Sequence, residues 1–152
     1  MTRFYGIDEA NDALPDVERI LLDLRDQRAE LIRLRDAVLA ASKRDDGERG
    51  AGDAPAATPG DDPDARDAEA AAARRLMRLR MQGLIDQMQA GVTRLVEREV
   101  TLREIEAGLI DFPALASGRQ IWLCWRLGEG DIEWWHELDE GFAGRRRLTD
   151  LT

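Results

Sequence analysis

The sequence predicts an α+β fold, predominantly helical, in which a long antiparallel helical hairpin is followed by a small antiparallel β-meander. Three observations carry this prediction. Two long stretches place apolar residues at helical spacing, an acidic stretch rich in glycine and proline separates them, and the last third of the chain alternates with period two. Six of the eight aromatic residues lie in 108–152, so this region has the bulk to form a compact sheet against the helices.

The first helical stretch carries a seam like that of a coiled coil. We expect a short helical lead-in from Asp8, as its N-cap, to Leu14, and Pro15 suits only the first turn of the helix that follows. That helix should run from Leu14 to about Lys43. Positions at alternating spacings of three and four form the seam, and arginine occupies two of them, Arg28 and Arg35. The apolar seam residues are Leu14, Val17, Leu21, Leu24, Leu31 and Val38.

The charge of the chain is concentrated in one segment. Residues 45–69 hold nine acidic and two basic residues, a net charge of −7 out of −9 for all 152 residues. The segment contains glycines and prolines but no large apolar side chain, so it cannot bury enough surface to offset the entropy of ordering. We therefore expect a flexible acidic linker over 45–67, between the first helix with its lead-in in 1–44 and the remainder in 68–152. An acidic interaction tail or a nucleic-acid mimic is the alternative.

A second helix follows the linker. Its seam residues are Met77, Met81, Leu84, Met88, Leu95 and Leu102. Two long helices joined by such a linker form an αα-hairpin. A hairpin of two helices leaves an apolar face uncovered, so the C-terminal region, a second copy of the chain, or both must cover it.

Short strands are expected in the C-terminal third. Alternation begins at Val100–Arg103, and the strands that follow are Leu109–Phe112, stopped by Pro113, then Gln120–Arg126 and Ile132–Glu137. A two-residue turn at Gly128-Glu129 or a four-residue loop gives the last hairpin the same register. That register opposes Trp125 to Ile132, Leu123 to Trp134, Ile121 to His136, Cys124 to Glu133, and Trp122 to Trp135.

Both ends of the chain resemble a known family. The stretch GLIDFPA, then GRQIWLCWRLGEGDIEWWHELDEGFAGR, and the opening IDEANDALPDVERILLDLR resemble bacterial family 2203 of the domains of unknown function. The resemblance leaves the linker unmatched. The family usually has a glycine where this chain has Glu99, and often a proline where it has Gly130. The resemblance implies no particular activity.

One group of polar residues is a candidate site. His136 is the only imidazole, and it could bind a divalent metal with carboxylates such as Asp111, Glu106 or Glu129, while Arg145 could hold a carboxylate. The alternative is a half-buried structural histidine on the apolar side, near Ile121. We favour the structural role and expect no metal or other cofactor.

Cys124 is expected to be an unreactive thiol. Its cross-strand neighbour in the expected register is Glu133, whose negative charge raises the pKa of the thiol.

The outer face of the sheet is a candidate interaction surface. In the expected register Trp122 and Trp135 are exposed neighbours, with Arg126 and Glu133 beside them, and a pair of exposed indoles is typical of a binding surface. The alternative is that the chain after Phe142 covers the pair. The favoured function is therefore a non-catalytic, oligomeric or protein-interaction module, with a homodimer or a partner protein. The alternative is an enzyme that depends on a metal or a small molecule and uses His136, Asp111 and nearby carboxylates.

Composition argues against several other classes. The single cysteine excludes an internal disulfide framework, and the single histidine excludes the usual multi-histidine metal sites. Without a basic stripe the chain lacks the electrostatic footprint of nucleic-acid binding. The acidic opening is unlike a secretory signal and no stretch is long and apolar enough to span a membrane, so we expect a cytoplasmic protein that contacts neither nucleic acid nor membrane.

Overall fold

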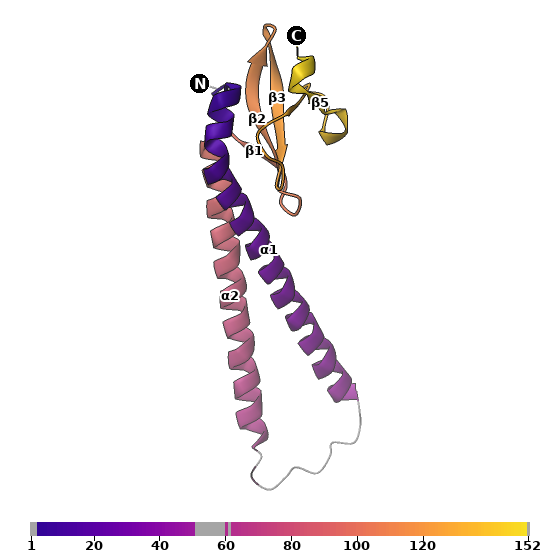
Figure 1. Cartoon of the computed structure of the whole chain (residues 1–152). Helices are drawn as coiled ribbons and strands as arrows, with labels where there is room; N and C mark the ends of the chain where they lie inside the picture. Colours follow the sequence, from indigo (N-terminus) through magenta and orange to yellow (C-terminus); the bar gives the residue numbers. More distant parts are fainter. Residues whose placement is uncertain (1–2, 51–59, 61, 152) are drawn as a thin grey trace. The chain divides into compact units, whose positions relative to one another are not determined.

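Two helices lead into a five-stranded antiparallel sheet (Figure 1). The computed structural model describes residues 3–50, 60 and 62–151, without the side chains of residues 45, 46 and 48–50. The chain forms two compact units. The first, Met1–Gln27 with Met88–Thr152, contains the sheet and is called the sheet unit below. The second, Arg28–Gln87, is called the hairpin unit. The expected helical hairpin and β-meander are both confirmed.

Helix α1 spans Ile7–Gly50 without a break. The expectation of a separate lead-in before Pro15 was wrong, because Pro15 lies inside the helix. A proline within a helix removes one backbone hydrogen bond and crowds the carbonyl four residues before it. The buried residues Ala10, Leu14 and Val17 hold both sides of Pro15 against the core, which offsets that cost.

Helix α2 spans Pro63–Glu97. At its start the Asp62 carboxylate accepts a hydrogen bond from the Asp64 N–H at 3.0 Å, and Pro63 occupies the first turn, where its missing N–H costs nothing. The two helices therefore extend into the expected linker 45–67 from both sides. Of the remaining linker positions, 51–59 and 61 lie outside the described residues.

The C-terminus of α2 ends in a Schellman motif. The N–H of Val100 donates to the Leu95 carbonyl and the N–H of Glu99 donates to the Val96 carbonyl. Glu99 has φ 56°, in the left-handed region that favours glycine. The motif turns the chain directly into the first strand.

The sheet is a meander in which each strand pairs with the next. Its strands are β1 Thr101–Glu104, β2 Leu109–Ala116, β3 Arg119–Arg126, β4 Trp134–His136 and β5 Arg146–Arg147. Short 3₁₀ helices at Phe142–Gly144 and Leu148–Asp150 flank β5.

Strand β2 continues through Pro113, where a stop was expected. The Pro113 carbonyl accepts a hydrogen bond from the Tyr5 N–H at 2.7 Å, so this residue faces the N-terminal segment rather than β3. Because an amide points to the same side as its own carbonyl in a strand, proline removes no bond from the β2–β3 ladder.

The register of β3 and β4 differs from the expected one by one residue. The observed partners are Trp122 with His136, Leu123 with Trp135, and Cys124 with Trp134. The connection is longer than a tight turn because two of its groups are held elsewhere. The Trp125 indole donates to the Gly130 carbonyl at 2.8 Å, and the Ile132 N–H donates to the Asn11 side chain at 2.7 Å.

The hydrophobic core of the sheet unit lies between one face of the sheet and the helices. The helices contribute a buried row that includes Leu21, Leu24 and Leu95, and the sheet contributes alternate residues of β2, β3 and β4. Those strand residues are Ile110, Phe112, Ala114, Ile121, Leu123, Trp125 and Trp135. The intervening strand residues therefore face the opposite side of the sheet, where the polar side chains of interest lie.

Candidate functional site

Three side chains with metal-ligating atoms meet on the sheet face opposite the core. Asp111 on β2 and Cys124 on β3 are direct cross-strand partners. On β4, Trp134 is the partner of Cys124, and His136 lies two residues after Trp134 on the same face of the sheet. The exposed fraction of each residue is 2% or less. The short side chain of Cys124, on the strand between the other two, leaves room for Asp111 and His136 to meet.

Asp111 is the centre of a hydrogen-bonded chain of charges. Its Oδ1 lies 3.0 Å from Nε2 of His136, and its Oδ2 accepts a hydrogen bond from Nε of Arg103 at 2.8 Å. The second ring nitrogen of His136, Nδ1, lies 2.8 Å from the Glu137 carbonyl oxygen. A carbonyl only accepts, so Nδ1 carries a hydrogen and donates it to the Glu137 carbonyl.

The thiol of Cys124 is part of the same cluster. One ligand atom each from Asp111, Cys124 and His136 can be chosen so that all three lie within 4.8 Å of one another. Burial and, secondly, the negative charge of Asp111 raise the pKa of the Cys124 thiol to about 12. The expected cause, Glu133, was wrong because the observed register places Trp134 opposite Cys124. A thiol of this pKa is a poor nucleophile near neutral pH.

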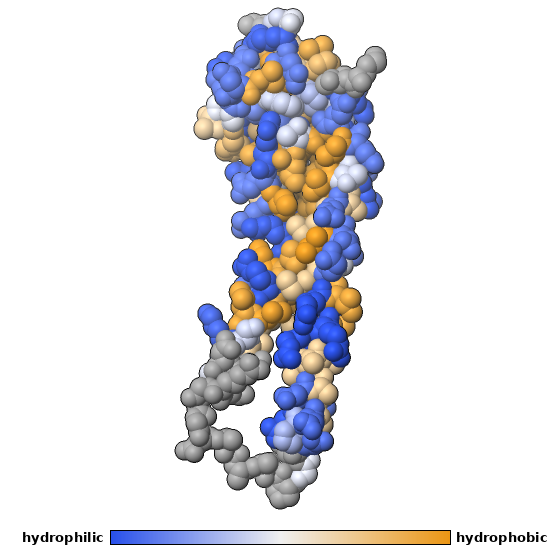
Figure 2. Space-filling view, turned by 180° about the vertical axis from the view of Figure 1, so that it is seen from behind, coloured by the Kyte–Doolittle hydropathy of each residue, from blue (hydrophilic) through white to orange (hydrophobic). Residues whose placement is uncertain are grey.

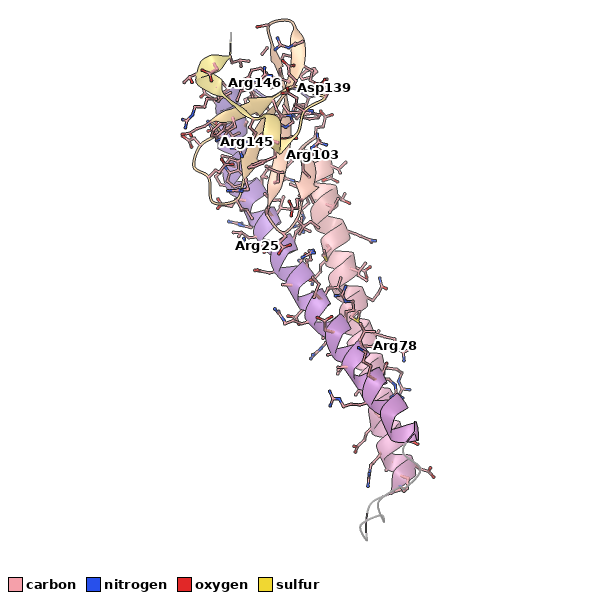
Figure 3. All side chains as sticks on the ribbon, turned by 90° about the vertical axis from the view of Figure 1, so that its right-hand side faces the viewer. Arg25, Arg78, Arg103, Asp139, Arg145 and Arg146 are labelled. Carbon is pink, nitrogen blue, oxygen red and sulfur yellow. The ribbon has the colours of Figure 1, made fainter. Side chains whose placement is uncertain are left out.

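Arginine and aromatic side chains stack on this face of the sheet. The Arg145 guanidinium lies 4.5 Å from the ring centroids of both Trp134 and Phe142, and it pairs with Glu129 at 2.5 Å. On the other side, Arg103 lies 5.1 Å from the Trp122 ring. Figure 3 shows Arg103 and Arg145 at the sheet. Arg103 also bonds to Asp111, and the charge of Arg145 acts on the Cys124 thiol, so both arginines lie beside the polar cluster.

The structure brings most of the sequence-predicted polar residues together. His136 and Asp111 are in direct contact, and the Glu129–Arg145 pair lies close enough for both charges to shift the pKa of Cys124. Glu106 stands apart, exposed in the turn between β1 and β2. The expected place of His136 beside Ile121 was wrong, since the shifted register turns it to the polar face. A correct prediction of this register would also have placed Cys124 on the same face as Asp111 and His136.

The expected tryptophan surface does not form. Trp135 is 3% exposed and pairs with Leu123 on the core face, because the register shift turns its side chain inward. Trp122 is half-buried and pairs with His136 instead. Arg126 and Glu133 remain exposed, but they flank no indole pair.

Among the described residues, no helix is both long enough and apolar enough to cross a membrane.

Comparisons with known proteins place the chain in a family. No curated protein and no solved structure matches the chain. A family model described as "Uncharacterized conserved protein (DUF2203)" matches residues 3–148. The match covers both helices and the strands, and the chain therefore belongs to this family of conserved proteins.

Proposed function

We propose that this chain is a non-catalytic interaction module that self-associates through its hairpin unit. The observation that supports the proposal is that the described apolar residues of the hairpin unit are only half-buried or exposed. Of the side chains described in Arg28–Gln87, none is buried. The seam residues are half-covered, and Leu39, Leu76 and Leu79 are 54%, 54% and 71% exposed. The half-covered residues include Leu31, Leu34, Val38, Met77, Met81, Leu84 and Ile85. Figure 2 shows hydrophobic side chains at the surface along these helices.

The described apolar residues of the hairpin unit lack the burial that normally stabilises packed helices. Most helical stability in proteins comes from packing an apolar face rather than from helix propensity, and burial contributes roughly 25 cal/mol for each Å² of apolar surface. A second copy presents the same stripe, and symmetric pairing of two identical surfaces is the commonest form of self-association. Two hairpins packed on these faces give a four-helix arrangement with a shared core.

The burial of the reactive groups supports a non-catalytic role. A general acid, base or nucleophile has to reach the substrate directly or through one water. Asp111, Cys124 and His136 are almost fully enclosed. A separate pocket of about 430 Å³, at the end of α2, is lined mainly by apolar residues such as Val96 and Trp122 and by none of these three.

Sedimentation equilibrium of the whole chain tests the proposal. We expect a dimer, and we expect Leu84→Asp to shift the equilibrium to monomer because a carboxylate enters the shared core. Gln87→Asp places the same group at an exposed position of the same helix and should leave the dimer unchanged. Tryptophan fluorescence reports whether the variants keep the sheet unit folded, since all four tryptophans lie in 122–135. A monomeric wild type would refute the proposal.

A further inference from the structure

The sequence alone favoured no metal, but from the observed side-chain cluster we infer that Asp111, Cys124 and His136 form a binding site for one divalent transition-metal ion of the zinc class. The three residues come from three adjacent strands and offer a carboxylate oxygen, a thiol sulfur and an imidazole nitrogen. One such atom from each lies within 4.8 Å of the other two, a separation that a central ion can bridge with small side-chain adjustments. The site goes beyond the proposed self-association and does not depend on it, because all three ligands belong to one chain.

Neighbouring groups hold the Asp111 carboxylate and the His136 ring in place by hydrogen bonds, as they do for the ligands of known metal sites. Arg103 holds Oδ2 of Asp111 at 2.8 Å, which directs Oδ1 toward the cluster. The Glu137 carbonyl holds Nδ1 of His136 at 2.8 Å, which leaves Nε2 directed toward Oδ1. Metal-bound histidines almost always donate their other ring N–H to a carbonyl or a carboxylate, and ligating carboxylates are likewise hydrogen-bonded.

The ligand types select the class of ion. Calcium and magnesium take oxygen ligands, whereas zinc is bound by cysteine, histidine and carboxylate together. Three protein ligands leave one position of a tetrahedral ion for water. A doubly charged ion with one thiolate and one carboxylate is neutral overall, which suits a centre that is almost fully enclosed.

The position of the site indicates that a bound ion would stabilise the fold. It would tie β2, β3 and β4 together on the face opposite the hydrophobic core, where β4 is only three residues long. Because a metal that binds only the folded state stabilises it by mass action, the unfolding constant should fall about 100-fold when free metal exceeds its dissociation constant 100-fold.

Cobalt(II) and zinc(II) titrations of the untagged whole chain test this inference. The chain has one cysteine and one histidine, so a thiolate-to-cobalt charge-transfer band can come only from Cys124. We expect the band to saturate at about one cobalt per chain, zinc to displace the cobalt, and both ions to raise the melting temperature. A wild-type chain that shows no such band, or whose melting temperature is the same with zinc and with a chelator, would overturn the inference.

Three variants sharpen the test. Cys124→Ser should abolish the band and weaken metal binding at least tenfold, and His136→Gln should weaken binding while the thiol remains. Glu104→Gln changes an exposed carboxylate of the same sheet, on β1, and serves as the matched control, with binding expected to be unchanged. Equal affinity for wild type and Cys124→Ser would overturn the site. Because the wild-type spectrum decides the assignment by itself, a variant that fails to fold does not remove the test.

Discussion

Among the residues that the structure describes, the same two helices have a buried core in the sheet unit and none in the hairpin unit. In the sheet unit, Val17, Leu21 and Leu24 of α1 are fully buried, and the strands supply the opposing apolar face. In the hairpin unit, the seam continues at the same spacing through Leu31 and Val38, yet these residues are only half-buried. The two units differ because the sheet covers the apolar face of the helices only in the sheet unit. A heptad-like seam indicates which face of a helix is apolar, but not what covers that face.

The largest expected effect contrasts two leucines of α1. Leu24→Asp places a carboxylate without a partner in the sheet unit's core, where Leu24 is fully buried, and should cost more than about 4 kcal/mol or prevent folding. Leu39→Asp is the matched change at a 54% exposed position and should alter monomer stability by less than about 0.5 kcal/mol. Urea unfolding of both variants, at a protein concentration below the dimer dissociation constant, measures the contrast. Similar losses would show that the hairpin unit has its own core within one chain.

The second prediction contrasts a buried hydrogen-bonded cluster with an exposed ion pair. Asp111→Ala, measured with a chelator present, removes the shared partner of His136 and Arg103 and should cost about 3–5 kcal/mol, because it leaves a buried polar group uncompensated. Glu30→Ala removes the partner of Arg33 on the surface of α1 and should cost at most about 0.5 kcal/mol. Equal effects would mean that the buried cluster contributes no more than a surface pair.

The third prediction uses two glycines of α2. A Cβ at Gly91 would lie 2.9 Å from the enclosed Leu24 side chain, whereas a Cβ at Gly83 would meet nothing within 4 Å. Gly83→Ala should stabilise by up to about 1 kcal/mol through helix propensity. Gly91→Ala should be less favourable than Gly83→Ala by about 1–3 kcal/mol, the cost of overpacking. Thermal unfolding followed by circular dichroism gives both values, and equal effects would refute the close approach of the helices at Gly91.

The last prediction is a pH dependence, which has no effect on stability near neutral pH. Burial raises the pKa of Cys124 from 9.0 to about 12, so the folded state holds this proton more tightly than the unfolded state. The stability that this contributes is complete below about pH 9 and is lost as the pH rises toward 12. Without metal, the free energy of unfolding should therefore fall more steeply above pH 9 in the wild type than in Cys124→Ala. Parallel slopes would show that the thiol is not enclosed.

Periodicity predicted both helices and strands β1 to β4, but neither strand β5 nor the register of β4. The alternation of β3 and the seams of both helices are local patterns, and the elements they predicted are present. The register of β4 depends on Asn11, which accepts a hydrogen bond from Ile132 across 121 positions of the sequence, and no hairpin rule includes such a contact. The continuation of β2 through Pro113 likewise depends on Tyr5, far away in the sequence.

Residue types alone predicted part of the candidate site, but not that Cys124 belongs to it. His136, Asp111, Glu129 and Arg145 were expected from their types, and the first two are in direct contact. Cys124 was missed, because an error of one residue in a strand moves every side chain to the other face. The same error predicted an exposed Trp135, which lies in the core. Sites built across several strands are therefore the hardest to predict from a single sequence.

Amide hydrogen exchange at a series of protein concentrations tests the central claim most directly, which is that the sheet unit carries its own core and the hairpin unit needs a second copy. As the protein is diluted below its dimer dissociation constant, amides of 28–50 and 63–87 should lose protection, while those of β2 and β3 should keep it. Protection of the hairpin amides that does not change with concentration would contradict the claim.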